Sequence, residues 1–195
     1  MIHPDTKLAF INEFIGHGVI ATKLIPAGTI TWVLDDLDME FTAEQIDKMH
    51  EEQKKYIDIY SYRNYKGNYV LCWDHSRFVN HSFNSNCLST AYDFEVAIRD
   101  IYPGEQLTDD YGYLNVENSF EPIAEAGNRS LVKPDDLLHF HNQWDEELKK
   151  TFPKIANLRQ PLQPFFSQND WWHIQEIAQG RREMESILKN YCAIS

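Results

Sequence analysis

Apolar and β-branched residues gather in short runs along the first half of the chain. Three such runs, 8–11, 18–22 and 29–34, are separated by glycine and proline, and 68–73 and 95–98 have the same character. Runs of this length, bounded by turn-forming residues, are typical of β-strands. The first half of the chain therefore reads as a β-rich body.

One segment inside this body has helical spacing instead. Thr42 followed by Gln45 fits a capping box, in which each residue's side chain bonds to the other's backbone. Apolar residues then recur from Ile46 to Tyr60 at helical intervals, with one polar gap. The pattern predicts a single helix in this region.

The spacing becomes helical again after residue 131. Apolar residues recur at helical intervals from Leu137 to Phe152, after Pro134, which a first helical turn tolerates. Pro153 is expected to stop this helix because proline lacks the backbone N–H that a helix interior needs.

A second helix is predicted to begin at a cap formed by Ser167 and Asp170. The cap is followed by an apolar stripe that is too hydrophobic to stay exposed to water. The stripe consists of Ile174, Ile177, Ala178, Met184, Leu188 and Tyr191. The predicted class is α+β, mainly β, with a β body at about 7–113 and a helical C-terminal tail.

Length and charge narrow the possible functions. A domain of 195 residues buries about 70% of its unfolded surface, so it needs no disulfide or metal to fold. Eighteen Lys and Arg against thirty Asp and Glu give a net charge of −12, which argues against direct nucleic-acid binding and suits a basic partner. The acidic excess lies in two runs, 35–58 with a net charge of −6 and 100–128 with −7.

Cysteines and the chain start indicate an intracellular protein. Cys72, Cys87 and Cys192 are odd in number and lack metal-ligand spacing, as expected in a reducing compartment. The first five residues lack a signal-peptide pattern, and no apolar run is long enough to span a membrane. We expect a cytoplasmic location, or a nuclear one in a eukaryotic cell or host, and no membrane association.

Three short motifs carry candidate chemistry. Gly16-His17-Gly18 precedes a strand, where two glycines allow a tight turn or a close approach to a ligand. The segment 77–87 concentrates amide, imidazole and hydroxyl groups, which equally suit a loop that satisfies its own backbone. The segment 97–113 contains a Pro-Gly turn and ends in two tyrosines two residues apart, which a strand would place on one face.

One reading of the second motif is a hydrolase. Cys87 would be its nucleophile and His81 its base. The sequence shows neither a third group to orient the histidine nor an oxyanion hole.

Taken together and in this order, the motifs resemble those of the SET-domain protein-lysine methyltransferases. The family has a GxG near its start, an RFxNHSxxPN segment and, roughly thirty residues later, a GEELTxDYxY segment. Here these stand at 16–18, 77–86 and 104–113. The resemblance covers about 7–113 and is greatest to the short stand-alone SET proteins, with no metal implied.

The resemblance implies a knot-like β-clip fold in which the second and third motifs thread together. It implies S-adenosylmethionine on one face, a substrate peptide on the other and a narrow aromatic channel between them. By motif matching, the cofactor would be bound by Gly16, His17, Gly18, Asn80, His81 and Tyr111. Tyr111 would also be the catalytic tyrosine at the methyl-transfer pore, with Trp32 and Tyr113 in the substrate channel.

Some residues depart from the family pattern. Asp109 stands where many members have Phe or Tyr, a position tied to the number of methyl groups added. The early strand lacks the tyrosine of the family's YxG motif, and Trp32 is the nearby ring. Phe83 stands where zinc-bearing members have a cysteine and no cysteine cluster follows Tyr113, so a zinc site is not implied, and Ser85 replaces the usual proline.

The expected activity is transfer of a methyl group from S-adenosylmethionine to a lysine of a protein with a basic segment. The alternative is a SET-like module that binds the cofactor or a basic peptide with weak or no turnover. The expected boundaries are 1–120 for the SET domain and 121–195 for a helical extension packed on it. We also expect 134–191 to form at least two helices that close one side of the substrate cleft.

Overall fold

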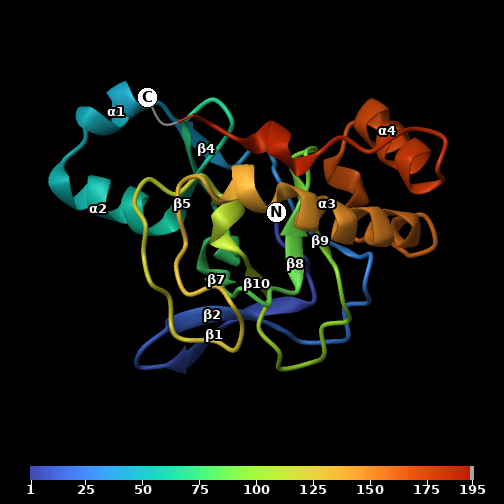
Figure 1. The fold of residues 1–195 in the computed structure, drawn as a ribbon, viewed down its shortest axis with the longest axis horizontal. Helices are drawn as coiled ribbons and strands as arrows, with labels where there is room; N and C mark the ends of the chain where they lie inside the picture. Colours follow the sequence, from blue (N-terminus) through green and yellow to red (C-terminus); the bar gives the residue numbers. More distant parts are fainter. Residues whose placement is uncertain (194–195) are drawn as a thin grey trace.

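The computed structural model describes residues 1–193, and four small sheets form the body of the molecule (Figure 1). Strands β1 (Thr6–Asn12) and β2 (Gly16–Ala21) form an antiparallel hairpin, and β3 (Ile30–Val33), β9 (Phe94–Ala97) and β8 (Cys87–Ser89) form an antiparallel sheet. Strands β4 (Met39–Phe41), β6 (Tyr69–Leu71) and β5 (Ser61–Arg63) form a third sheet. The fourth pairs β10 (Thr108–Asp109) with β7 (Asn80–His81). The strand runs predicted from the sequence are confirmed.

The segment predicted as one helix forms two, α1 (Ala43–Asp47) and α2 (Glu51–Tyr60). The capping box at Thr42 and Gln45 is present, as predicted. A second cap lies at His50, whose backbone N–H donates to the Gln53 side chain at 3.0 Å. His50 is extended, so the first helix ends before it and a second helix begins after it.

Two helices form the tail, α3 (Asp136–Ile155) and α4 (Gln168–Ala178). Pro153 does not stop α3. It lies in the last turn of the helix, where proline removes one backbone hydrogen bond, and the buried Ile155 beyond it still packs in the core. The Ser167 cap is confirmed, with its Oγ accepting from the Asp170 N–H at 3.1 Å. The apolar stripe does not continue as one helix to Tyr191, because α4 ends before Gly180, whose φ of +71° is left-handed.

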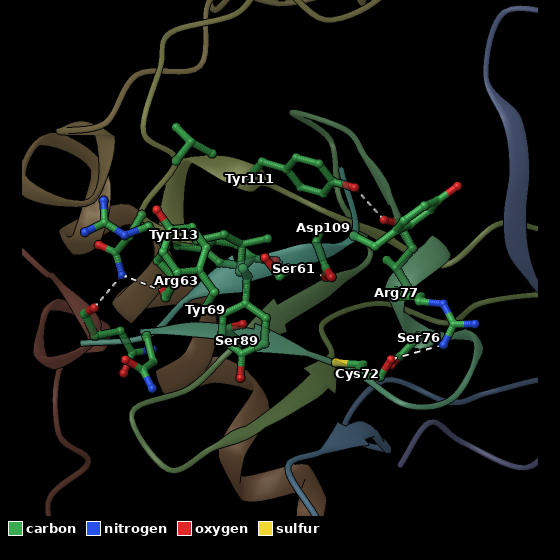
Figure 2. Close-up of a pocket in the computed structure, with 18 of the residues that line it drawn as sticks. Ser61, Arg63, Tyr69, Cys72, Ser76, Arg77, Ser89, Asp109, Tyr111 and Tyr113 are labelled. Atoms are coloured by element: carbon green, nitrogen blue, oxygen red, sulfur yellow. Dashed lines mark hydrogen bonds between the residues drawn. The ribbon is translucent and has the colours of Figure 1, made fainter. Parts of the chain in front are cut away.

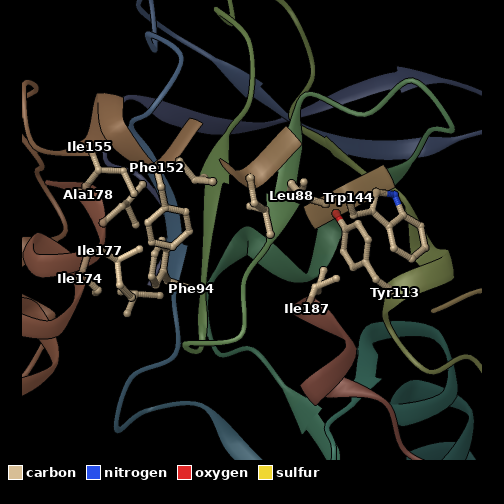
Figure 3. Packing of buried hydrophobic residues seen from close by; sticks show 14 of the residues in the cluster. Leu88, Phe94, Tyr113, Trp144, Phe152, Ile155, Ile174, Ile177, Ala178 and Ile187 are labelled. Carbon is tan, nitrogen blue, oxygen red and sulfur yellow. The ribbon is translucent and has the colours of Figure 1, made fainter. Parts of the chain in front are cut away.

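The main hydrophobic core joins this tail to the β body (Figure 3). Most of its buried members come from β3, β8 and β9 on one side and from α3 and α4 on the other. Phe94 and Phe152, from the two sides, have ring centroids 6.0 Å apart. Fully burying one such side chain stabilises a fold by roughly 1.5–3 kcal/mol, so the tail helices are integral to the packing. The boundary at residue 120 stays a prediction, and 194–195 lie outside the described residues.

Residues 1–193 also contain short 3-10 helices. They are η1 (His75–Phe78), η2 (Tyr111–Tyr113), η3 (Gln163–Phe165) and η4 (Ile187–Asn190). The pair Tyr111 and Tyr113 therefore lies in a 3-10 turn and not in a strand, because the Asp110 side chain accepts from the Gly112 N–H at 3.0 Å and caps it. Across residues 1–193, no helix combines the length and apolar character needed to cross a lipid bilayer.

Candidate active site

The second and third sequence motifs meet at the two-stranded parallel pair β7–β10. Thr108 lies opposite Asn80 and Asp109 opposite His81, and the Ser82 N–H donates to the Asp109 carbonyl at 2.9 Å. Strands this short need support from both flanks, because isolated pairs are marginal in water. The crossing brings residues that lie far apart in the sequence into one site.

Asn80 connects this crossing to the first motif. Its Nδ2 donates to the His17 carbonyl at 3.1 Å and to Gln106 Oε1 at 3.0 Å. A Cβ on Gly18 would lie only 2.5 Å from that Gln106 oxygen and 2.6 Å from Asn80 Nδ2. Gly16, with φ of +78°, adopts a left-handed conformation that favours glycine. Gly18 is therefore required because a side chain would not fit, and Gly16 is favoured by its left-handed backbone conformation.

His81 holds the tyrosine motif in place. Its Nδ1 accepts from the Tyr111 backbone N–H at 3.1 Å, which places the ring proton on Nε2. Burial lowers the pKa of His81, so the ring is neutral at pH 7. Nε2 is buried and has no partner within residues 1–193. That N–H is available to a bound ligand, since buried polar groups in folded proteins are normally hydrogen-bonded.

Tyr111 lies where the crossing meets a cavity. Its hydroxyl donates to the Val79 carbonyl at 2.6 Å. Burial, and then the negative charge of Asp109 and Glu95, raise the pKa of Tyr111 well above its ordinary value. The phenol is therefore neutral, and because its one proton is committed to Val79, its oxygen can only accept a further hydrogen bond.

The cavity has a volume of about 430 Å³, within the usual range for ligand sites (Figure 2). Aromatic residues contribute much of its wall, including Trp32, Tyr62, Tyr111 and Tyr113. The Trp32 and Tyr62 rings meet edge to face with centroids 5.9 Å apart. A cavity of this kind accepts a long apolar stem with a polar end.

Asp109 and Glu95 add two carboxyl groups to the cavity lining. Asp109 Oδ1 accepts from the Tyr113 hydroxyl at 3.0 Å, and Glu95 Oε1 accepts from the Ser89 hydroxyl at 2.9 Å. Sequence reasoning noted Asp109 only as a departure and missed Glu95. The available signal was a charged residue within the buried apolar strand β9.

Most of the cofactor-binding residues predicted from the sequence lie together at the crossing, but the His17 side chain does not. Asn80, His81, Gly18 and Tyr111 are joined by the contacts above. The His17 side chain is exposed between the rings of Phe10 and Phe78, at centroid distances of 5.8 Å and 6.3 Å, and it reaches the crossing through its carbonyl alone.

The predicted channel residues both line the cavity, with different surroundings. Trp32 is 7% exposed and packs on Tyr62. Tyr113 is 2% exposed, and its ring meets Trp144 of α3 edge to face at 5.3 Å. Tyr113 therefore forms a wall shared between the cavity and the core.

The surroundings of Cys87 contradict the cysteine-hydrolase reading. Cys87 is 1% exposed, and burial raises the pKa of its thiol well above its ordinary value. The thiolate is the nucleophilic form, so this cysteine is inert. His81 Nδ1 already accepts from Tyr111.

The carboxylates of the two acidic runs fall into two sets around the site, and Arg63 and Arg77 are cations in the cavity lining. Asp58 and Glu117, one from each acidic run, are exposed and line the cavity. Asp35 and Asp38 instead organise their own loop, where the Asp38 carboxylate accepts from the Asp35 N–H at 3.1 Å. Within residues 1–193, no cluster of three or more His, Cys, Asp or Glu side chains is arranged to hold a metal ion.

An ion-pair network fixes the far side of the tyrosine turn. Arg129 pairs with Asp110, which precedes Tyr111, and its Nη2 lies 2.6 Å from Asp136 Oδ2 at the start of α3. The same guanidinium lies 4.3 Å from the centroid of the Phe140 ring. The first tail helix is thereby tied directly to the turn that carries Tyr111.

A family model matches about half of the chain. Residues 16–112 match the family model described as SET domain. The matched range begins at the first glycine of the GxG motif and ends one residue after Tyr111. No curated protein matches the chain.

Proposed function

This chain carries a SET domain at residues 16–112, and from it we propose a protein-lysine methyltransferase that uses S-adenosylmethionine. The observation that supports this most is the position of Tyr111. On one side, its backbone N–H donates a hydrogen bond to His81, which lies beside Asn80 and the GxG turn. On the other side, Tyr111 lines the aromatic cavity. A cofactor site and a side-chain channel that meet at one tyrosine suit group transfer between two ligands.

The residues on the cofactor side fit such a ligand. The His81 Nε2 proton has no partner within residues 1–193, and the space above Gly18 is too narrow for any side chain. We assign Gly16, Gly18, Asn80 and His81 to cofactor binding, with His17 contributing its backbone. S-adenosylmethionine supplies, when bound, a methyl group on a positively charged sulfur.

The residues on the channel side fit a lysine side chain. The free pKa of lysine is about 10.4, so the amine must lose its proton at the site before it can accept a methyl group. The Tyr111 oxygen accepts a hydrogen bond from the amine and so aligns its lone pair toward the methyl donor. Alignment of this kind lowers the barrier by removing rotational freedom before the reaction.

The partner we propose is a protein with a basic segment around the target lysine. Support comes from Asp58 and Glu117, which are exposed at the cavity, and from the acidic runs that contain them. Exposed charges of this kind steer an oppositely charged ligand toward a site. We also propose an intracellular location, in keeping with the free thiols of Cys72, Cys87 and Cys192.

The second candidate is a SET-like module that binds the cofactor or a basic peptide with weak or no turnover. It is favoured by the indole of Trp32 at the cavity, where the family pattern supplies a nearby tyrosine hydroxyl. Methyl transfer separates this candidate from the enzyme, whereas cofactor binding is common to both.

Calorimetry with S-adenosylmethionine and a chelator tests the cofactor assignment. The full chain should bind, while Gly18→Ala and Asn80→Ala should bind at least tenfold more weakly. Asn84→Ala is the matched control, because Asn84 lies in the same loop with an exposed side chain. No heat from wild-type protein at millimolar cofactor contradicts the proposal.

A further inference from the structure

Two buried carboxyl groups lie together in the wall of the cavity. Asp109 is 5% exposed and Glu95 is 9% exposed, and the two lie close enough to share a hydrogen bond. A hydrogen bond between two carboxyl groups requires a proton on one of them. After the pair loses one of its two protons, it therefore holds one shared proton and carries one negative charge.

Burial is the main influence on the charge of this pair. It raises the pKa of Glu95 to about 7 and the pKa of Asp109 well above its ordinary value. The pKa of Asp109 is raised further than that of Glu95, so Glu95 is the carboxyl that loses its proton near neutral pH. The titratable groups that face the pair are Tyr62 of β5, Cys72 of β6, Cys87 of β8, Asp110, Tyr111 and Tyr113 of the turn around η2, and the N-terminal ammonium.

The cation that acts on the pKa of Glu95 is the N-terminal ammonium, which is already paired with Asp35, and Arg63 and Arg77 also line the cavity. The tyrosines and cysteines that face Glu95 have raised pKa values and are neutral at pH 7. Asp110 adds negative charge near Asp109, while the N-terminal ammonium lowers the pKa of Glu95. A carboxylate so placed at a cavity attracts a cation from outside, since buried charges are normally paired.

An independent observation in the same cavity also indicates a ligand. Trp32 lines the cavity and is 7% exposed, and its indole Nε1 has no partner within residues 1–193. A buried indole N–H normally finds a hydrogen-bond partner. The cavity thus combines two buried carboxyl groups with an indole N–H that has no acceptor within residues 1–193.

We propose that the Glu95–Asp109 pair binds the ammonium group of the target lysine in the cavity and accepts its proton. The inference rests on the proposed function, because it assigns a role toward that substrate. An N–H bond of the ammonium breaks and leaves its electron pair on nitrogen, while an O–H bond forms on Glu95. The amine then has the free lone pair that methyl transfer requires, and the proton passes from Glu95 to water when the product leaves.

Binding of a lysine stand-in by the cofactor-free chain tests this proposal directly. The probe is Nα-acetyl-lysine methyl ester, and Nα-acetyl-norleucine methyl ester is its uncharged counterpart. Affinities are measured by NMR titration at about pH 6 and about pH 7.5. Between these values, the ionised fraction of a group with the pKa of Glu95, about 7, rises roughly eightfold.

Wild-type protein should bind the lysine ester roughly eightfold more tightly at the higher pH, with no such change for the norleucine ester. The double variant Glu95→Gln/Asp109→Asn should lose the change, although its amides still accept from Ser89 and Tyr113. Asp145→Asn is the matched control, a buried carboxylate of α3 whose Oδ1 accepts from the Ile187 N–H at 2.9 Å. This control should retain the pH response.

The single variant Glu95→Gln tests whether Glu95 is the carboxyl that acts, and it guards against a folding defect in the double variant. Glu95→Gln should abolish the pH response near 7, since Glu95 is the carboxyl that ionises there. A response that persists in Glu95→Gln, or that is absent from wild type, overturns the proposal.

A second readout uses turnover. The kcat/KM of wild type for a lysine acceptor should level off above about pH 7.5, while that of the double variant should keep rising toward the free lysine pKa of about 10.4. The loss at pH 7.5 should be on the order of a hundredfold or more and should close at high pH. Parallel profiles would overturn the proton-acceptor role. No turnover in wild type, with the ester response intact, would instead count against the proposed function.

Discussion

Glu95→Gln should make the protein more stable at alkaline pH. The folded pKa of Glu95, about 7, lies above the ordinary value of 4.5. The folded state therefore holds the proton more tightly than the unfolded state, and this contribution to stability is fully present below about pH 4.5. It is lost as the pH rises through about 7, because the buried carboxylate then carries a charge that burial penalises.

The difference between these two pKa values sets the magnitude. A rise from 4.5 to about 7 corresponds to about 3 kcal/mol, at about 1.36 kcal/mol for each unit of pKa. Glutamine keeps the acceptor for the Ser89 hydroxyl and never ionises. The variant should match wild type near pH 4.5 and exceed it by up to about 3 kcal/mol near pH 8.5.

Urea unfolding followed by tryptophan fluorescence at intervals between these pH values measures the difference. Glu121→Gln is the control, because Glu121 is exposed and should leave the pH dependence unchanged. A free-energy difference that stays constant with pH, or a variant that is less stable than wild type at pH 8.5, would refute the reasoning.

Three further predictions concern the pore, the tail and the acidic surface. Tyr111→Phe should lower kcat for methyl transfer at least tenfold with little change in cofactor affinity, and kcat within twofold of wild type would show that another tyrosine acts. Leu148→Ala, at a fully buried position of α3, should lower the free energy of unfolding by about 2–5 kcal/mol, whereas a cost below about 1 kcal/mol would contradict integral packing of the tail. Asp58→Lys and added salt should each raise KM for a basic peptide at unchanged kcat, and indifference of KM to both would remove the steering role of the acidic run.

The strands and both tail helices could be predicted from the sequence because their patterns are local. The cap at Thr42 and the cap at Ser167 are each encoded within four residues and are present. The break between α1 and α2 depends on a second cap at His50, whose histidine is not a common capping residue. Pro153 misled because the burial of Ile155, which no local pattern shows, extends the helix past it.

At the candidate site, too, local motifs could be predicted from the sequence and tertiary contacts could not. The motifs around Asn80 and Tyr111 are recognisable in the sequence, and the structure joins them through His81. Glu95 was missed because its importance depends on pairing with Asp109, which lies in another sheet. The ion pair of Arg129 with Asp110 is likewise a tertiary contact between segments with no shared pattern.

Transfer of a labelled methyl group tests the central claim most directly. The full chain is incubated with methyl-labelled S-adenosylmethionine and lysine-rich acceptor proteins, and the modified residue is identified by mass spectrometry, with Tyr111→Phe in parallel. We predict label on lysine side chains with wild-type protein and at least tenfold less with the variant. Cofactor binding without label on any acceptor would contradict the enzyme and favour the binding module, and label on a residue other than lysine would contradict the assigned substrate.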